Sequence, residues 1–297
     1  MIATYELTVS TLDKKLMLHP FPTLRLRGLI GECIYRYSKT NNSGLYRRFF
    51  KPIKPLNQLK ILKRLILPKP YIILPPQHLY SEKLLIHLRV FGHPNQHMNE
   101  VLKALKTTGC KLKLESAAVM DESSHTRITL KEDFRPAAYI TYKTLMEKAS
   151  NLASSHENVG LILDFLTPFQ LTQEGKPILA DSIKPADIVR YAARRLFILD
   201  SLYYSKGREL PFPLTPTTVS QFIDWADKNI QMKARLSAVK GFYHHQHLLT
   251  GRITIQIPAK EHGPKIIFLL LTSQYLGIGK WTAYGMGQYQ IHTWSDT

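Results

Sequence analysis

The chain has 297 residues, of which 44% are hydrophobic, and it carries 40 lysines and arginines against 22 acidic residues. This apolar content is sufficient for one large or two medium globular domains, and it excludes an intrinsically disordered chain. A formal net charge of +18 exceeds what solubility requires and favours a polyanionic partner bound largely through phosphate neutralisation.

The apolar and cysteine patterns argue against membrane and disulfide-stabilised classes. The longest wholly apolar run covers residues 266–271, which is too short to span a bilayer. The N-terminus lacks the basic and apolar segments of a secretion signal, so we expect a cytoplasmic protein without a membrane partner. Cys33 and Cys110 lack the paired spacing of a zinc site, and we expect both to be buried free thiols.

Apolar periodicity in the first half predicts alternating strands and helices. Alternation over residues 2–9 predicts a strand, and apolar spacings of three and four over 26–37 predict an amphipathic helix. Gly28 and Gly31 lower the stability of this helix unless a neighbour packs closely against them. After a basic, proline-punctuated stretch over 51–76, we predict a strand at 84–90, a helix at 98–106 and strands at 111–120 and 126–130.

The second half looks related to the first, as another layered arrangement of sheet and helix. We predict a strand at 159–166, helices at 187–203 and 217–230, strands at 234–239 and 252–257, a helix at 266–276 and a strand at 284–292. Strand, helix, two strands, helix and strand is the order of a ferredoxin-like unit. The sequence therefore predicts an α+β fold of two tandem ferredoxin-like (RRM-like) domains, over residues 1–155 and 156–297.

The most informative segment is the glycine-rich run over residues 277–287, between the last predicted helix and the last predicted strand. Glycines permit positive φ and close backbone approach, their N–H groups can form an anion-binding nest, and Lys280 adds a cation. A nucleotide phosphate loop is disfavoured because Gln274 replaces its first glycine and Trp281 follows the lysine. We interpret the run as an RNA-binding loop, with a tight turn that binds nothing as the alternative; the predicted contacts are Gly277, Gly279, Lys280, Gly285 and Gly287.

Two further basic clusters fit an RNA partner. Arg190 and Arg194 lie four apart on the helix predicted at 187–203, Arg195 follows, and no acid lies between residues 188 and 199. This favours RNA contact over a plain solvated helix surface. The second cluster interleaves cations with aromatic residues suited to unpaired bases, although Phe49 and Phe50 fit a hydrophobic core equally well; its members are Tyr46, Arg47, Arg48, Phe49, Phe50 and Lys51.

The remaining polar residues give no sign of a metal or hydrolase centre. The histidines His244, His245 and His247 have no carboxylate or cysteine at ligand spacing, so we predict no metal site and no cofactor. Glu32 and Arg36 lie four apart and are most simply a pair on the helix surface.

The glycine-rich run has the pattern GxGKxTxxGxG, and residues 26–31 (LRGLIG), 163–169 (LDFLTPF) and 194–196 (RRL) accompany it. Together these segments resemble the CRISPR-associated endoribonucleases of the RAMP superfamily, which cut precursor guide RNA within its repeats. The resemblance follows nearly the whole chain in order. It implies tandem ferredoxin-like domains and metal-independent cleavage, in which the ribose 2′-hydroxyl attacks the adjacent phosphate and leaves a cyclic phosphate and a 5′-hydroxyl.

Such chemistry needs a base for the 2′-hydroxyl, an acid for the leaving oxygen and a cation for the developing phosphorane. In relatives the base is often a histidine on or near the first helix. This chain has His19 just before that helix and no histidine within it, and Tyr46-Arg47-Arg48 stands where some relatives have a histidine after the helix. The resemblance therefore implies His19, Tyr46 and Arg48 as candidate catalytic residues, with Arg47 and Lys51 as RNA contacts.

Two functional hypotheses follow from the resemblance. The first is a repeat-specific endoribonuclease that retains its product and passes it to the subunits of a CRISPR effector complex. The second is a non-catalytic RNA-binding subunit of such a complex that uses the same loop and charge. A general RNA-binding protein would leave the order of motifs unexplained. Whether the protein forms a homodimer stays open.

Overall fold

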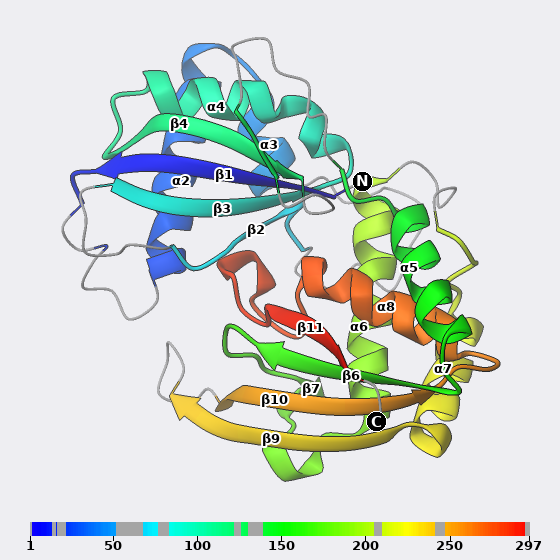
Figure 1. Cartoon of the computed structure of the whole chain (residues 1–297). Helices are drawn as coiled ribbons and strands as arrows, with labels where there is room; N and C mark the ends of the chain where they lie inside the picture. The colour runs from blue at the N-terminus through cyan, green and yellow to red at the C-terminus, as the bar shows by residue number, and fades with distance from the viewer. Residues whose placement is uncertain are drawn as a thin grey trace. The chain divides into compact units, whose positions relative to one another are not determined.

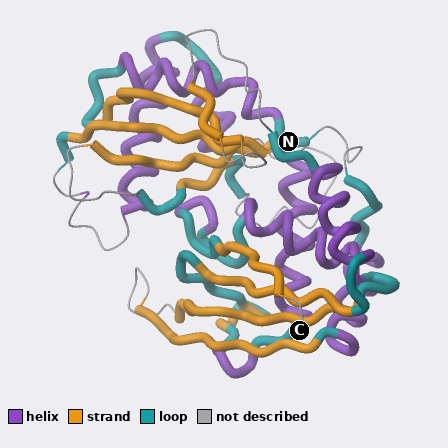
Figure 2. Tube along the Cα trace, in the orientation of Figure 1, coloured by secondary structure: helices purple, strands orange, loops and turns teal. Residues whose placement is uncertain are grey.

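The computed structural model divides the chain into two compact units (Figure 1, Figure 2). It describes residues 2–13, 16, 22–51, 68–76, 83–121, 126–129, 139–204, 210–240 and 247–294. Unit 1 comprises Met1–Ile140 and Leu202–Tyr204, and unit 2 comprises Thr141–Ser201 and Ser205–Thr297. None of the helices in the described part of the chain is long and apolar enough to cross a membrane.

Unit 1 is a five-stranded antiparallel sheet in the order β2-β3-β1-β4-β5, with helices on one face (Figure 1). This is the predicted ferredoxin-like order, extended by β5 beside β4. In chain order the elements are β1 (Ile2–Thr11), α2 (Pro22–Thr40), α3 (Leu45–Phe50), β2 (Tyr71–Ile73), β3 (Lys83–Phe91), the 3₁₀ turn η2 (His93–His97), α4 (Met98–Thr107), β4 (Leu112–Asp121) and β5 (Thr126–Thr129).

The aromatic residues of α3 complete the core of unit 1. Phe49 and Phe50 are buried, which confirms the core interpretation for both. The ring of Phe50 accounts for the glycine at position 31 of α2, because a Cβ at Gly31 would lie 2.9 Å from the Cε1 atom of Phe50. Gly28 faces open space instead. Close packing thus requires glycine at one position of α2 and not at the other.

The buried amide of Asn95 fixes the turn between β3 and α4. Tyr5 in β1 donates its hydroxyl to Asn95 Oδ1 at 3.0 Å, and Asn95 Nδ2 donates to the carbonyls of Val90 and Gly92, each at 3.1 Å. Burial raises the pKa of Tyr5, so its hydroxyl stays protonated as a donor. Gly92 has φ +64°, and a Cβ there would lie 2.1 Å from the carbonyl oxygen of Tyr203. The turn is therefore held by side chain and backbone together.

Unit 2 repeats the ferredoxin-like order with a sheet arranged β11-β6-β10-β9. Its elements are α5 (Tyr142–Ser154), β6 (Asn158–Phe165), β7 (Thr172–Gln173), β8 (Lys176–Pro177), the 3₁₀ turn η3 (Ala180–Ser182), α6 (Pro185–Tyr203), α7 (Pro216–Asn229), β9 (Gln231–Lys240), β10 (His247–Pro258), α8 (Gly263–Leu276), the 3₁₀ turn η4 (Thr282–Tyr284) and β11 (Tyr289–Trp294). Alternate residues of β6 and β10 are buried, and these are Leu161, Leu163, Phe165, Ile253, Ile255 and Ile257.

The predicted strands and helices are present in the described residues, with a few differences. The last strand begins at Tyr289 and not at residue 284, because η4 and the positive-φ glycines Gly285 and Gly287 occupy the intervening turn. Helices α3 and α5 and the short strands β2, β7 and β8 were not predicted. A division after residue 155 would place α5 in the first half, whereas the structure groups α5 with unit 2.

Both cysteines are free thiols, as predicted, although their burial differs. Cys33 is fully buried on α2, and burial together with the neighbouring Cys110 thiol raises its pKa to about 12. Cys110 itself is half-buried, not buried as expected. The Glu32 and Arg36 side chains form the predicted pair on the surface of α2.

The two glycines of α2 give the first test. Gly28→Ala should stabilise the protein by up to about 1 kcal/mol, because alanine is the better helix former and the added methyl group meets nothing. Gly31→Ala should destabilise it by about 1–2 kcal/mol, because overpacking against Phe50 outweighs the same gain. Urea unfolding midpoints measure both, and equal stabilisation by the two variants would contradict the packing described for Gly31.

Candidate functional site

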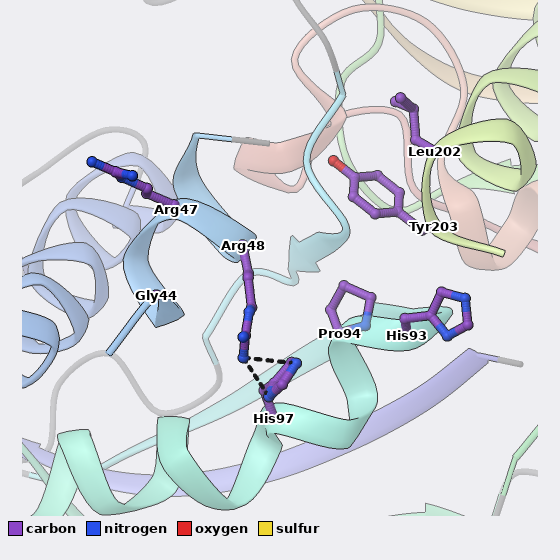
Figure 3. Close-up of a pocket in the computed structure, with 8 residues that line it drawn as sticks. All are labelled: Gly44, Arg47, Arg48, His93, Pro94, His97, Leu202 and Tyr203. Carbon is purple, nitrogen blue, oxygen red and sulfur yellow. Dashed lines mark hydrogen bonds between the residues drawn. The ribbon is translucent and has the colours of Figure 1, made fainter. Parts of the chain in front are cut away.

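A cavity of about 410 Å³ in unit 1 collects cationic and imidazole side chains (Figure 3). Its described lining residues are Gly44, Arg47, Arg48, His93, Pro94, His97, Leu202 and Tyr203. The arginines come from α3 and the histidines from η2, so elements far apart in the sequence supply the two kinds of group. Guanidinium groups suit phosphate, and imidazoles suit proton transfer near neutral pH.

A chain of polar contacts crosses this cavity. Arg48 Nη1 lies 3.0 Å from both ring nitrogens of His97, and His97 Nδ1 lies 3.2 Å from Glu100 Oε1 in the first turn of α4. In Figure 3 Arg48 points toward His97, whereas Arg47 points away from it. The imidazole is therefore held between a cation and a carboxylate.

The predicted catalytic residues have different positions. Arg48 lines the cavity, whereas His19 lies outside the described residues. The ring of Tyr46 is stacked on the ring of Phe50, with centroids 5.2 Å apart. It also forms an edge contact with the ring of Tyr35, and these two centroids are likewise 5.2 Å apart. The described lining of the cavity does not include Tyr46, which packs against the hydrophobic core. The structure thus brings Arg47 and Arg48 to one cavity without Tyr46.

The histidines of the cavity were missed by the sequence analysis. His93 and His97 are four residues apart, on either side of Asn95, and they precede a predicted helix. The available signal was this pair next to Gly92 and Pro94, which mark a turn. Nothing local indicates that His97 meets Arg48, because 49 residues separate them.

The arginines of α6 are not equivalent RNA contacts. Arg190 Nη1 is paired with Asp187 Oδ1 at 2.9 Å, a carboxylate just outside the acid-free stretch considered from the sequence. Arg195 Nε donates to the carbonyl of Leu276 at 3.2 Å and so bonds one of the terminal carbonyls of α8. Arg194 is exposed. Of the three, Arg194 is best placed to contact a large polyanion.

The glycines of the 277–287 loop make close backbone contacts inside unit 2. A Cβ at Gly279 would lie 2.4 Å from the carbonyl oxygen of Gln170, and one at Gly287 would lie 1.8 Å from that of Ile278. Many loop amides donate to protein carbonyls, namely those of Gly277, Ile278, Lys280, Tyr284, Gly285 and Gly287. These amides do not form the anion-binding nest expected from the sequence, because their hydrogen atoms are already used.

Lys280 and residues of the sheet supply cations on the surface of unit 2. The Lys280 side chain is exposed, with its Nζ 6.0 Å from the centroid of the Trp281 ring. Lys233 and Arg235 are exposed on β9, and Arg235 stands directly opposite Arg252 of β10. Like charges in this position repel each other, and Arg252 is also bonded to Asp164 Oδ2 at 2.8 Å. The sequence analysis identified Lys280 but not Lys233, Arg235 or Arg252.

The described residues show no metal centre. Among them, no group of three or more histidine, cysteine, aspartate or glutamate side chains could hold a metal ion. His247 is exposed at the start of β10, and its carbonyl accepts a bond from Gln170 Nε2 at 2.9 Å. His244 and His245 lie outside the described residues.

Comparison with known families finds a match in each half of the chain. Residues 163–289 match the family model described as CRISPR-associated endoribonuclease Cas6, and residues 1–130 match a model described as an N-terminal domain. The second half of the chain is therefore similar to the Cas6 endoribonucleases. Among curated proteins, no match to the chain is found.

Solved Cas6 structures share the tandem ferredoxin-like fold. A Cas6 product complex is 15% identical with a TM-score of 0.60, over 98% of this chain and 100% of that chain. Thermus thermophilus Cas6 is also 15% identical, with a TM-score of 0.56 over 98% of each chain. A partial Cas6-RT-Cas1–Cas2 complex matches at 12% identity and a TM-score of 0.62, over 98% of this chain and 46% of that chain. The predicted fold class is thereby confirmed.

The loop contacts predict different effects of two substitutions within the 277–287 loop. Gly287→Ala should destabilise unit 2 by several kcal/mol, because the Cβ collides with a carbonyl and φ is +68°. Lys280→Ala should change stability by less than about 0.5 kcal/mol, because the side chain is exposed. Thermal unfolding measures both. A Gly287→Ala protein as stable as wild type would show that the loop is not packed as described.

Proposed function

We propose that this protein is an endoribonuclease of the Cas6 type that cleaves precursor CRISPR RNA within its repeats without a metal ion. The ribose 2′-hydroxyl attacks the adjacent phosphate, which leaves a 2′,3′-cyclic phosphate and a 5′-hydroxyl. The observation that carries the proposal is the cavity of unit 1, which joins Arg48 to two histidines in a chain whose second half matches an endoribonuclease family. A cation and imidazoles are the groups that this reaction needs.

In this proposal the α3 residues serve the phosphate. Arg48 stabilises the charge that develops on the phosphorane, and Arg47 and Lys51 contact the RNA backbone on either side. Tyr46 acts as a positioning residue, because its amide donates to Ser38 Oγ at 2.9 Å and its ring stacks on Phe50, which fixes α3. The general base that takes the proton of the 2′-hydroxyl is a histidine, a role for which the family resemblance implies His19.

The surface of unit 2 supplies the cations that hold the rest of the repeat. Lys280, Arg194 and the β9 residues Lys233 and Arg235 are exposed. The repulsion between Arg235 and Arg252 falls when a phosphate lies between them, so RNA binding relieves an unfavourable pair. We propose backbone contact with RNA only for those amides of the 277–287 loop that do not already donate to a protein carbonyl.

The partners we propose are repeat RNA, the retained product and other CRISPR-associated proteins. One similar structure is a Cas6 product complex, and others are Cas6-RT-Cas1–Cas2 complexes. By analogy, this chain keeps its product bound and delivers it to subunits of an effector complex. A non-catalytic RNA-binding subunit is the competing proposal, favoured by the position of Tyr46 away from the cavity lining.

Cleavage of the protein's own repeat RNA in EDTA is the direct test. We expect one discrete cut, ends that carry a cyclic phosphate and a 5′-hydroxyl, and no cut when the residue at that position has a 2′-deoxy sugar. The 2′-deoxy RNA is the matched control, since it binds through the same phosphates but lacks the nucleophile. Specific binding without cleavage of the unmodified RNA would support the non-catalytic subunit instead.

The salt dependence of RNA affinity tests the proposed surface. Lys280→Ala and Arg194→Ala should each weaken binding and lower the slope of log K against log salt by about 1, because each removes one phosphate contact. Arg36→Ala is the control, since Arg36 is exposed on α2 and paired with Glu32. Titrations at several salt concentrations measure the slopes. A slope unchanged in Lys280→Ala would remove this residue from the interface.

A further inference from the structure

His97 has partners that determine which of its nitrogens carries the proton. Glu100 is acceptor-only when ionised, so the Nδ1 atom that faces it at 3.2 Å must be the donor. Arg48 is donor-only and its Nη1 lies 3.0 Å from both ring nitrogens, so once Nδ1 donates to Glu100, only Nε2 has a lone pair that can accept from Arg48. The neighbours thus select the neutral tautomer with Nδ1 protonated and Nε2 ready to accept a proton.

His97 and Glu100 are held in place by the same short stretch of chain. His97 ends η2 and precedes α4, and Glu100 lies three residues later in the first turn of that helix. Asn95, two residues before His97, is anchored by its three buried hydrogen bonds. The His97 side chain is 27% exposed, so a ligand in the cavity can reach it. Among the described residues, the charged or titratable groups near it are Glu100 from α4, which contacts it, and four that line the same cavity, namely Arg47, Arg48, His93 and Tyr203.

We propose that His97 is the general base of the cleavage reaction and that Glu100 is its positioning residue. This inference rests on the proposed function, but it assigns the base to a residue other than His19. In the free protein, Arg48 donates a hydrogen bond to the lone pair of His97 Nε2. When the scissile phosphate enters the cavity, Arg48 turns to it, because a guanidinium–phosphate bond is charge-assisted on both sides. That exchange exposes Nε2 to the 2′-hydroxyl.

The step balances within the RNA and the imidazole. His97 Nε2 takes the proton of the 2′-hydroxyl while the 2′ oxygen forms a bond to phosphorus. The bond from phosphorus to the 5′ oxygen breaks, and that oxygen leaves with its electron pair and takes a proton from water. His97 then returns its proton to solvent, so the protein ends in the state in which it began. No oxidant, reductant or further reactant is needed.

Single-turnover cleavage of the repeat RNA, measured beside RNA affinity, tests the assignment. His97→Ala should slow cleavage by about 10²- to 10⁴-fold with unchanged affinity, the usual contribution of a general base. Added imidazole should restore part of the rate by occupying the vacated space, an effect that a purely structural role would not give.

Glu100→Gln tests the positioning role. The amide can donate to Nδ1 and so stabilise the wrong tautomer, and we expect the rate to fall about tenfold or more with unchanged affinity. Glu147→Gln is the matched control, because Glu147 is also an exposed helical glutamate, paired with Lys143 at 3.9 Å on α5, and it should leave the rate unchanged.

The outcomes separate this inference from the proposed function. If His97→Ala cleaves like wild type while His19→Ala is inactive, the inference is overturned and the endoribonuclease proposal stands. If His97→Ala loses affinity together with rate and imidazole restores neither, His97 is a binding residue and the inference is also overturned. If the wild-type protein binds its repeat RNA without cutting it, both proposals fail.

Discussion

The buried amide of Asn95 is the interaction on which the functional part of unit 1 depends. Asn95 is only 2% exposed. It accepts a hydrogen bond from Tyr5 in the central strand and donates one to Val90 of β3 and one to Gly92 in the turn that follows. A buried polar group costs free energy when it loses its partners, so the turn has one favourable conformation. Because η2 and the first turn of α4 follow directly, the same amide sets the positions of His93, His97 and Glu100.

In unit 2 the 277–287 loop is held in place differently, by close contacts between stretches of backbone. The 277–287 loop packs against the segment after β6, and side chains at Gly279 and Gly287 would collide with carbonyl oxygens. The glycines therefore allow the loop to pack closely. This packing leaves the Lys280 side chain exposed on the surface. A similar distinction applies to the net charge of +18. Some cations are paired with carboxylates of the same chain, such as Arg190 with Asp187 and Arg252 with Asp164, so the net charge overstates the positive charge available to a polyanion.

More of the fold than of the candidate site could be predicted from the sequence. Strands and helices with one buried face leave a period of two or near 3.6 in the sequence, which is why the order of both ferredoxin-like units could be predicted. Helix α3 has only six residues, too few to show a helical period. Helix α5 does bury Tyr142, Leu145 and Ala149 at helical spacing, a signal that was present but not used. Arg48 could be predicted from its basic, aromatic neighbourhood, but its contact with His97 depends on how α3 and η2 pack, and no local pattern encodes that packing.

The proposed exchange of Arg48 between His97 and phosphate would couple base activation to substrate placement. A base with a permanently open lone pair could act on any ribose that reached it, whereas here Nε2 is covered until a phosphate attracts the guanidinium. The hydrogen bond from Arg48 to His97 has one charged partner, and the bond to phosphate has two, so the exchange is favourable once the phosphate is desolvated in the cavity. RNA held elsewhere on the basic surface would leave Arg48 in place. In this arrangement one side chain both covers the base and recognises the substrate, and specificity for the cleavage position follows from geometry as well as affinity.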